Sequence, residues 1–133
     1  MKNNTARFTV KSIQDLYTLI QNVTDLTPLA GTTGVLKDCR TDRFYLPESV
    51  VLLKNIPELE TIVKRERFID FGAAAALSTI IELGKKNVPD ILYQALSRTA
   101  NPGVRLLATI GGNIAQAPIQ HSCLIPLIAL DRS

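Results

Sequence analysis

A chain of 133 residues, of which 46% are hydrophobic and 20% are charged, has the size and composition of one globular domain that can bury its own core. The net charge is only +3 and the basic residues are dispersed, apart from short clusters at 64–67 and 85–86, which argues against nucleic-acid binding. The apolar stretches are too short to cross a bilayer and no secretory signal opens the chain, so we expect a cytoplasmic protein that makes no membrane contact.

Residue types that carry metal or nucleophilic chemistry are sparse. Cys39 and Cys123 lie far apart, with no other cysteine or histidine at ligand spacing, so no metal site is expected. The single histidine, His121, has only the adjacent Ser122 as a candidate nucleophile, and neighbours in sequence rarely face each other. We therefore expect no catalytic acid, base or nucleophile in this chain.

The first part of the chain alternates extended and helical patterns. An extended segment at 7–10 precedes a helix predicted over 13–22, for which Ser12 is the N-cap candidate. Four apolar residues of this helix recur on one face: Ile13, Leu16, Leu19 and Ile20. Residues 25–30 predict a strand that leads through a small-residue loop into a short helix, and the β-branched run at 49–53 predicts a buried strand.

The middle of the chain predicts a hairpin followed by helices. Residues 59–63 and 68–71 flank a charged tetrapeptide and predict two short strands joined by a polar turn. Ser78 is the candidate cap of a helix over 79–84, and Pro89 suits the first turn of another helix. That second helix should direct four side chains inward: Ile91, Leu92, Ala95 and Leu96. Further on, 101–103 (Asn-Pro-Gly) predicts a turn, and 123–130 predicts a buried helix.

Two glycine-containing segments are candidates for ligand contact. Gly31-Thr32-Thr33-Gly34 combines small residues, which expose backbone N–H groups, with two hydroxyls and a following helix N-terminus, a combination that suits phosphate. A tight turn with solvent-facing threonines explains this loop equally well.

The second segment, Gly111-Gly112-Asn113, requires either a close approach to the backbone or a turn with positive φ. A simple turn is again an alternative. The segment matches neither the Walker loop nor the Gly-x-Gly-x-x-Gly dinucleotide fingerprint, so generic nucleotide folds are disfavoured.

Taken in order, four segments resemble the FAD-binding subunit of the molybdenum hydroxylases, the family of xanthine dehydrogenase. They are Ala30 to Gly34, Leu53 to Leu59 (Leu-Lys-Asn-Ile-Pro-Glu-Leu), Phe71 to Ala74, and Ala100 to Arg105 leading to Ala108 to Ala115 (Ala-Thr-Ile-Gly-Gly-Asn-Ile-Ala). The last is the most specific, and the resemblance covers nearly the whole chain.

The resemblance implies an α+β fold in which FAD lies between two lobes. A small βαβ lobe would span residues 1–53, and an incomplete mixed or antiparallel sheet lobe with helices would span 54–133. The implied cofactor-binding residues fall in two groups. They are Leu29, Ala30, Gly31, Thr32, Thr33, Gly34 and Val35 around the diphosphate, and Ala108, Thr109, Gly111, Gly112, Asn113 and Ser122 on the other side.

The chain departs from the family pattern at two places. The family loop usually reads Ala-Gly-Gly-Thr-Asp, whereas Thr32 replaces the second glycine and Gly34 replaces the acid. An aspartate that contacts the flavin in the family is replaced here by Ser122 or Cys123, depending on a one-residue gap.

The resemblance also implies a role. Family subunits pass electrons from iron–sulfur centres through FAD to NAD or another acceptor, while a separate molybdopterin-binding subunit hydroxylates the substrate. Because family subunits run on for about as many residues again, we expect a truncated chain that is not catalytic alone and that forms a homo-oligomer. The alternative is a non-catalytic assembly module that does not bind FAD.

Overall fold

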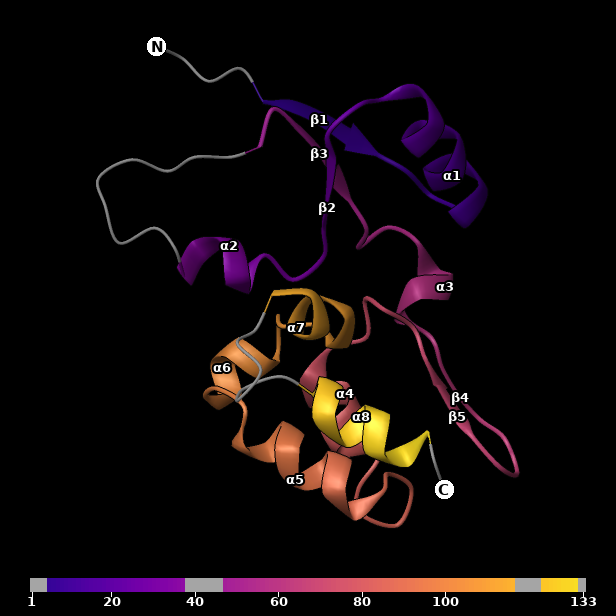
Figure 1. The fold of residues 1–133 in the computed structure, drawn as a ribbon, viewed down its shortest axis with the longest axis vertical. Coiled ribbons are helices and arrows are strands. Elements are labelled where there is room, and N and C mark those ends of the chain that lie inside the picture. Colours follow the sequence, from indigo (N-terminus) through magenta and orange to yellow (C-terminus); the bar gives the residue numbers. More distant parts are fainter. Residues whose placement is uncertain (1–4, 38–46, 117–122, 132–133) are drawn as a thin grey trace.

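The computed structural model describes residues 5–37, 47–116 and 123–131, which form an α+β fold, as expected. A parallel sheet with strand order β1-β3-β2 occupies one end of the molecule, and most of the helices lie at the other end (Figure 1). The strands are β1 (Ala6–Thr9), β2 (Leu26–Leu29) and β3 (Ser49–Leu52). The helix α1 (Ile13–Asn22) connects β1 to β2, which gives the βαβ unit.

The predicted helix over 13–22 is confirmed at both ends. Ser12 caps it, because its hydroxyl accepts a hydrogen bond of 3.0 Å from the Asp15 N–H. Leu16 and Leu19 pack on the small core formed by Val10, Val51 and Ile56. Ile13 and Ile20, the other two apolar residues of the predicted stripe, are about half exposed. A sheet of three short strands is too narrow to cover the whole apolar stripe of a helix.

The predicted hairpin is confirmed but is shorter than expected. Strands β4 (Ile62–Lys64) and β5 (Ile69–Phe71) pair in antiparallel fashion, with Ile62 opposite Phe71. Residues 59–61 were expected to begin the first strand, and this is wrong, because the single helical turn α3 (Pro57–Glu60) comes first. Pro57 favours that turn, since its fixed φ suits the first position of a helix.

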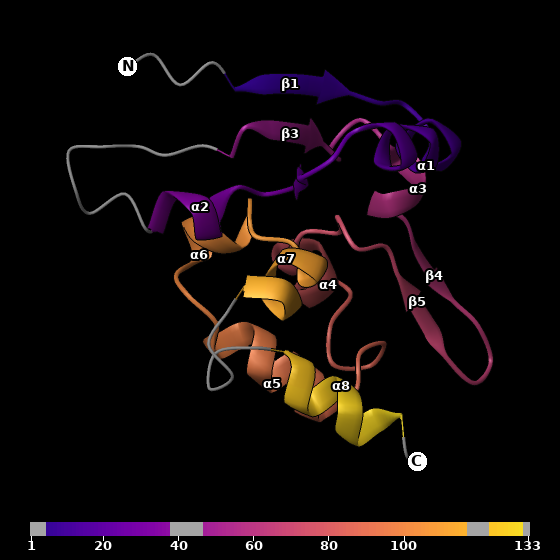
Figure 2. The same cartoon turned by 45° about the horizontal axis from the view of Figure 1, so that its top comes forward.

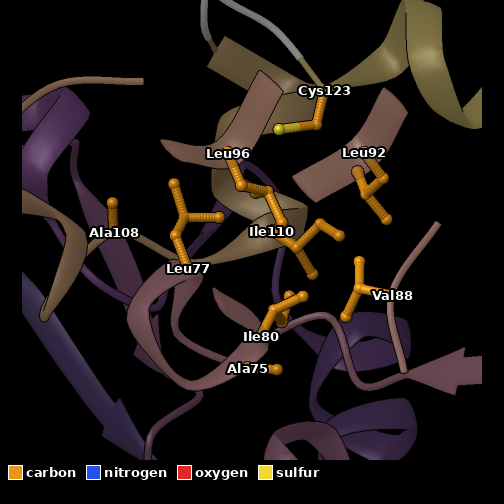
Figure 3. Packing of buried hydrophobic residues seen from close by; sticks show 9 residues of the cluster. All are labelled: Ala75, Leu77, Ile80, Val88, Leu92, Leu96, Ala108, Ile110 and Cys123. Carbon is orange, nitrogen blue, oxygen red and sulfur yellow. The ribbon is translucent and has the colours of Figure 1, made fainter. Parts of the chain in front are cut away.

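The main core lies among the five described helices that follow the hairpin. These are α4 (Leu77–Glu82), α5 (Asp90–Arg98), α6 (Pro102–Arg105), α7 (Ile110–Gln116) and α8 (Leu124–Leu130). Nine buried residues form the core, as Figure 3 shows: Ala75, Leu77, Ile80, Val88, Leu92, Leu96, Ala108, Ile110 and Cys123. Within the described ranges, no helix is long and apolar enough to cross a membrane.

Three expectations for these helices are wrong. Ser78 is not a cap, because α4 already begins at Leu77, whose N–H donates to the Ala108 carbonyl at 2.9 Å. Ile91 does not point inward and is 48% exposed, whereas Leu92 and Leu96 are buried. The helix α8 is not buried as a whole, since Ile125 and Ile128 are both more than half exposed.

The segment predicted to be a turn at 101–103 is instead the start of α6. The side-chain oxygen of Asn101 accepts a hydrogen bond of 2.9 Å from the Val104 N–H, which caps the helix. An N-cap asparagine followed by proline at the first helical position is a favourable helix start. Asparagine and proline, which predicted a turn, therefore begin a helix here.

Candidate functional site

The parallel strands end at a common edge, where the chain leaves the sheet. Leu29 of β2 is in register with Leu52 of β3, and the Leu53 N–H donates to the Leu29 carbonyl at 2.9 Å. Ligands of α/β folds bind outside the carboxyl ends of parallel strands. The residues that follow the two strands, Ala30 to Thr32 and Lys54, therefore occupy the position at which a ligand is expected.

A groove of about 440 Å³ lies at this edge, between the parallel sheet and the helical part of the chain. It brings together residues of the first glycine-containing loop, residues that precede the second glycine segment, and residues that precede or belong to α3 and α4. Its lining residues are Ala30, Gly31, Thr32, Lys54, Glu60, Ala74, Ala75, Ala76, Thr79, Leu106, Leu107 and Thr109. In both cartoon views α7 lies between the sheet end of the molecule and the helices α5 and α8 (Figures 1 and 2). The groove is thus a junction between the parallel-sheet part and the helical part of the chain.

Gly31 of the first segment lies against the backbone that leads into the second segment. A Cβ atom built on Gly31 would overlap with the carbonyl oxygen of Leu107 and would lie 2.7 Å from its carbonyl carbon. These are backbone atoms, so a side chain cannot be accommodated by rotating a neighbouring group. Glycine at position 31 is therefore required for this loop to approach the backbone of Leu107.

The N–H groups of the second segment are already engaged by protein acceptors. The Ile110 N–H donates to the Ala75 carbonyl at 3.0 Å and the Gly111 N–H to the Ala73 carbonyl at 2.9 Å. The Gly112 N–H donates to the Thr109 hydroxyl at 3.2 Å. The first two bonds attach the start of α7 to residues 73–75, which precede α4. Gly111, Gly112 and Asn113 are not among the described residues that line the groove.

The glycines of the second segment are helical, so of the two alternatives the turn with positive φ is wrong. In the described ranges, Gly84 is the glycine with positive φ. Close backbone approach is instead observed at Gly111, where a Cβ would lie 2.6 Å from the Ala73 carbonyl oxygen. Two glycines weaken a helix intrinsically, and here the cap from Thr109 offsets part of that cost.

The first segment has N–H groups that are not engaged. Over the described part of the chain, the N–H groups of Gly31, Thr32 and Thr33 have no protein hydrogen-bond partner. Thr32 has a φ of 58°, in the left-handed region, which costs an L-residue about 1–2 kcal/mol. This loop therefore carries both strain and available donors, a combination found at ligand-binding segments.

The remaining sequence-predicted residues are spread around the junction. Leu29 is buried at the end of β2, and Ala108 is buried in the main core. Thr33, Gly34 and Val35 begin the short helix α2 (Thr33–Lys37), and Gly34 lies against the side chain of Gln116. The side-chain oxygen of Asn113 accepts a 2.7 Å hydrogen bond from the Cys123 N–H. Ser122 lies outside the described residues.

Sequence reasoning missed the groove residues that lie outside the two glycine segments. Lys54, Glu60 and Thr79 line the groove and were not proposed as contacts. For Lys54 a signal was available, because the residue follows directly after a strand predicted to be buried. For Glu60 and Thr79 no local pattern would have identified the groove.

Cys123, one of the two residues that could replace the family aspartate, faces the core. Its sulfur lies on the side of Leu96 in Figure 3, and the residue is fully buried. Burial raises the pKa of the Cys123 thiol above its ordinary value, and a hydrogen bond with Thr99 lowers it by less. The thiol is therefore protonated near neutral pH and packs in the main core.

Comparison with known proteins gives consistent matches. A family model described as "FAD binding domain in molybdopterin dehydrogenase" matches residues 3–133. The nicotinate dehydrogenase FAD-subunit of Eubacterium barkeri is 31% identical over 132 residues, which cover 93% of this chain. The match covers only 43% of that relative, so the chain spans less than half of the relative's length.

Solved structures show the same fold. Quinoline 2-oxidoreductase from Pseudomonas putida 86 matches with a TM-score of 0.73 and 26% identity, covering 85% of this chain and 40% of that chain. Carbon monoxide dehydrogenase from Oligotropha carboxidovorans also matches with a TM-score of 0.73, at 27% identity, covering 84% of this chain and 39% of that chain.

Proposed function

The chain belongs to the family of FAD-binding domains of the molybdopterin dehydrogenases, whose cofactor is FAD, and from this premise we propose that it binds the diphosphate of FAD at the junction groove. The observation that carries the proposal is that one groove is lined both by Ala30 to Thr32 of the first glycine-containing loop and by Leu106, Leu107 and Thr109, which precede the second glycine segment. Residues 1–53 and 54–133 would be the two FAD-binding lobes.

The residues of the groove fit an anionic ligand with extended apolar parts. The loop from Gly31 to Thr33 offers N–H groups without protein partners, which suit phosphate oxygens. Ala74, Ala75 and Ala76 present small side chains that leave room for a planar group. Thr109 would complete the opposite wall with its backbone and surface, since its hydroxyl already accepts from Gly112.

The other residues implied by the family resemblance have supporting roles in this proposal. Leu29 and Val35 would fix the two ends of the diphosphate loop. Gly111, Gly112 and Asn113 would hold the second segment in place through their contacts with Ala73, Thr109 and Cys123. Ser122 would contact the flavin.

Bound FAD would supply the redox chemistry, and the protein would bind and orient it. In our proposal the electrons come from an iron–sulfur subunit and leave to NAD or another acceptor, while a molybdopterin-binding subunit acts on the substrate. The name of the related FAD-subunit supports an assembly of this kind. No side chain of this chain is assigned as acid, base or nucleophile.

A second candidate function is an assembly module that does not bind FAD. It is favoured by the threonine at position 32, which occupies a left-handed conformation that suits glycine. It is also favoured by the second segment, whose first-turn N–H groups are engaged within the protein. Such a module would retain the fold and the surfaces that contact partner subunits.

Calorimetric titration of the chain with FAD, ADP and riboflavin tests the proposal. The polar groups of the groove lie around the expected diphosphate position, so ADP should bind within about tenfold of the affinity for FAD, and riboflavin should bind much more weakly. A strong preference for FAD over ADP would place the main contacts at the flavin ring instead. Absence of binding by both FAD and ADP would overturn the proposal and leave the assembly module.

We further infer that copies of the chain associate. The helix α8 exposes Ile125 and Ile128, which are 55% and 52% accessible, and exposed apolar surface of this kind favours interfaces. Sedimentation velocity over a hundredfold concentration range should show a dimer or larger species. The double change Ile125→Glu and Ile128→Glu should shift it toward monomer, whereas a monomeric parent protein at every concentration would contradict the inference.

A further inference from the structure

Two side chains of opposite charge line the junction groove. Lys54 follows β3, and Glu60 ends the helical turn α3. They do not pair with each other, because among the described residues the ion pair is the one between Arg65 and Asp70. Lys54 also makes no hydrogen bond within that part of the chain. The groove therefore contains a cation without a counter-charge bound to it.

The position of Lys54 is fixed by the backbone on both sides. The Leu53 N–H donates to the Leu29 carbonyl at 2.9 Å, which ties the end of β3 to the end of β2. The Ile56 N–H donates to the Leu53 carbonyl at 3.1 Å, and the Ile56 side chain is fully buried. Lys54 thus leaves the sheet beside the loop that follows Leu29, and this loop carries the free N–H groups of Gly31 to Thr33.

A lysine beside free N–H groups is a favourable arrangement for an anion. Charge-assisted hydrogen bonds to phosphate are shorter and stronger than neutral ones, and Lys acts as a point charge that needs no fixed geometry. Glu60 on the same groove opposes this effect, because its carboxylate repels phosphate oxygens. The net attraction is the difference between the two contributions.

We propose that Lys54 is the charged group that recognises the diphosphate, and that Glu60 limits the affinity of the same site. This inference rests on the proposed binding of FAD and names the side chains that set the affinity of the groove for FAD. It implies that the groove distinguishes ligands by the number of their negative charges. The affinity for adenosine should depend on neither side chain. Lys54 should raise the affinity for both ADP and FAD, and Glu60 should lower it.

Four variants test this assignment. Lys54→Gln and Glu60→Gln each remove one charge from the groove at nearly constant size. Lys86→Gln and Glu82→Gln remove the same charges at exposed positions that do not line the groove. Titration with FAD, ADP and adenosine at low and high salt, together with a melting curve for each variant, gives the readouts.

Lys54→Gln should weaken the binding of ADP and FAD about five- to tenfold at low salt, and less at high salt. Glu60→Gln should tighten both about two- to fivefold. Adenosine binding and the melting temperatures should stay constant, because Lys54 has no partner within the described chain. The two control variants should bind like the parent.

The outcomes separate the two proposals. If the parent binds FAD and ADP but Lys54→Gln binds them equally well, the role of Lys54 is refuted and the FAD proposal stands. If Lys54→Gln and Lys86→Gln weaken binding equally, the effect is a general one of net charge and the assignment is again refuted. If the parent binds neither FAD nor ADP, the FAD proposal fails and this inference falls with it.

Discussion

Replacing Gly31 by alanine should lower the free energy of unfolding by about 2–4 kcal/mol and abolish FAD binding. The added Cβ would overlap with the carbonyl oxygen of Leu107, so one of the two backbone segments has to move. Leu107 and Ala108 are held by the bond from the Leu77 N–H to the Ala108 carbonyl and by the start of α7. Urea unfolding and a FAD titration of the same sample measure both effects.

Gly103→Ala is the matched control for this change. Gly103 lies in the short helix α6, where an added Cβ meets only the Asn101 side-chain oxygen at 3.4 Å, an ordinary contact distance. Alanine also has the higher helix propensity, so this variant should be neutral or slightly more stable than the parent. Wild-type stability of Gly31→Ala would show that the lobes do not meet through residue 31.

The elements that formed as predicted are those whose capping and turn residues lie within a few positions of the element. The helix α1 begins at its Ser12 cap, and the hairpin β4–β5 surrounds its charged turn. The errors occurred where distant segments decide the outcome. The start of α4 at Leu77 is set by pairing with Ala108, thirty-one positions further along the chain. Local patterns contain no information about such a partner.

The candidate site was predictable only in part, because local patterns do not identify the distant segments that meet there. Small residues at 31 and 111 indicated a close approach, but the sequence alone favoured neither a ligand nor another segment as the neighbour. The structure places the backbone of Leu107 against Gly31 and that of Ala73 against Gly111. Lys54 lies at the groove because β3, which it follows, is the central strand of the sheet, between β1 and β2. That order cannot be obtained from the local pattern of each strand.

The position of Cys123 gives the second prediction of large effect. The residue lies in the main core together with Leu92, Leu96 and Ile110 (Figure 3). Its N–H is bound to the Asn113 side chain, which fixes the start of α8. A carboxylate at this position would therefore be buried among apolar side chains, without a cation beside it among the core residues.

Cys123→Asp should destabilise the fold by at least about 3 kcal/mol at neutral pH, since an unpaired buried charge is costly. Burial would raise the pKa of this carboxyl above its unfolded value of roughly 3.9, so folding retains a proton that the unfolded chain releases. Stability should therefore be highest below about pH 4 and fall as the pH rises toward 7, relative to Cys123→Ala. The alanine variant loses only packing, about 1–2 kcal/mol, and carries no titrating group at this position.

Unfolding curves of both variants at several pH values between 4 and 8 measure the difference, because the other titrating groups are common to the two. The native thiol adds no pH dependence to the stability between pH 4 and 8, because burial raises its pKa from an ordinary value of 9.0. The stability contributed by the protonated thiol is lost only at higher pH. A Cys123→Asp protein as stable as Cys123→Ala, with no added dependence on pH, would show that the residue 123 side chain reaches solvent. The family aspartate could then correspond to position 123, whereas the expected loss leaves Ser122 as its counterpart.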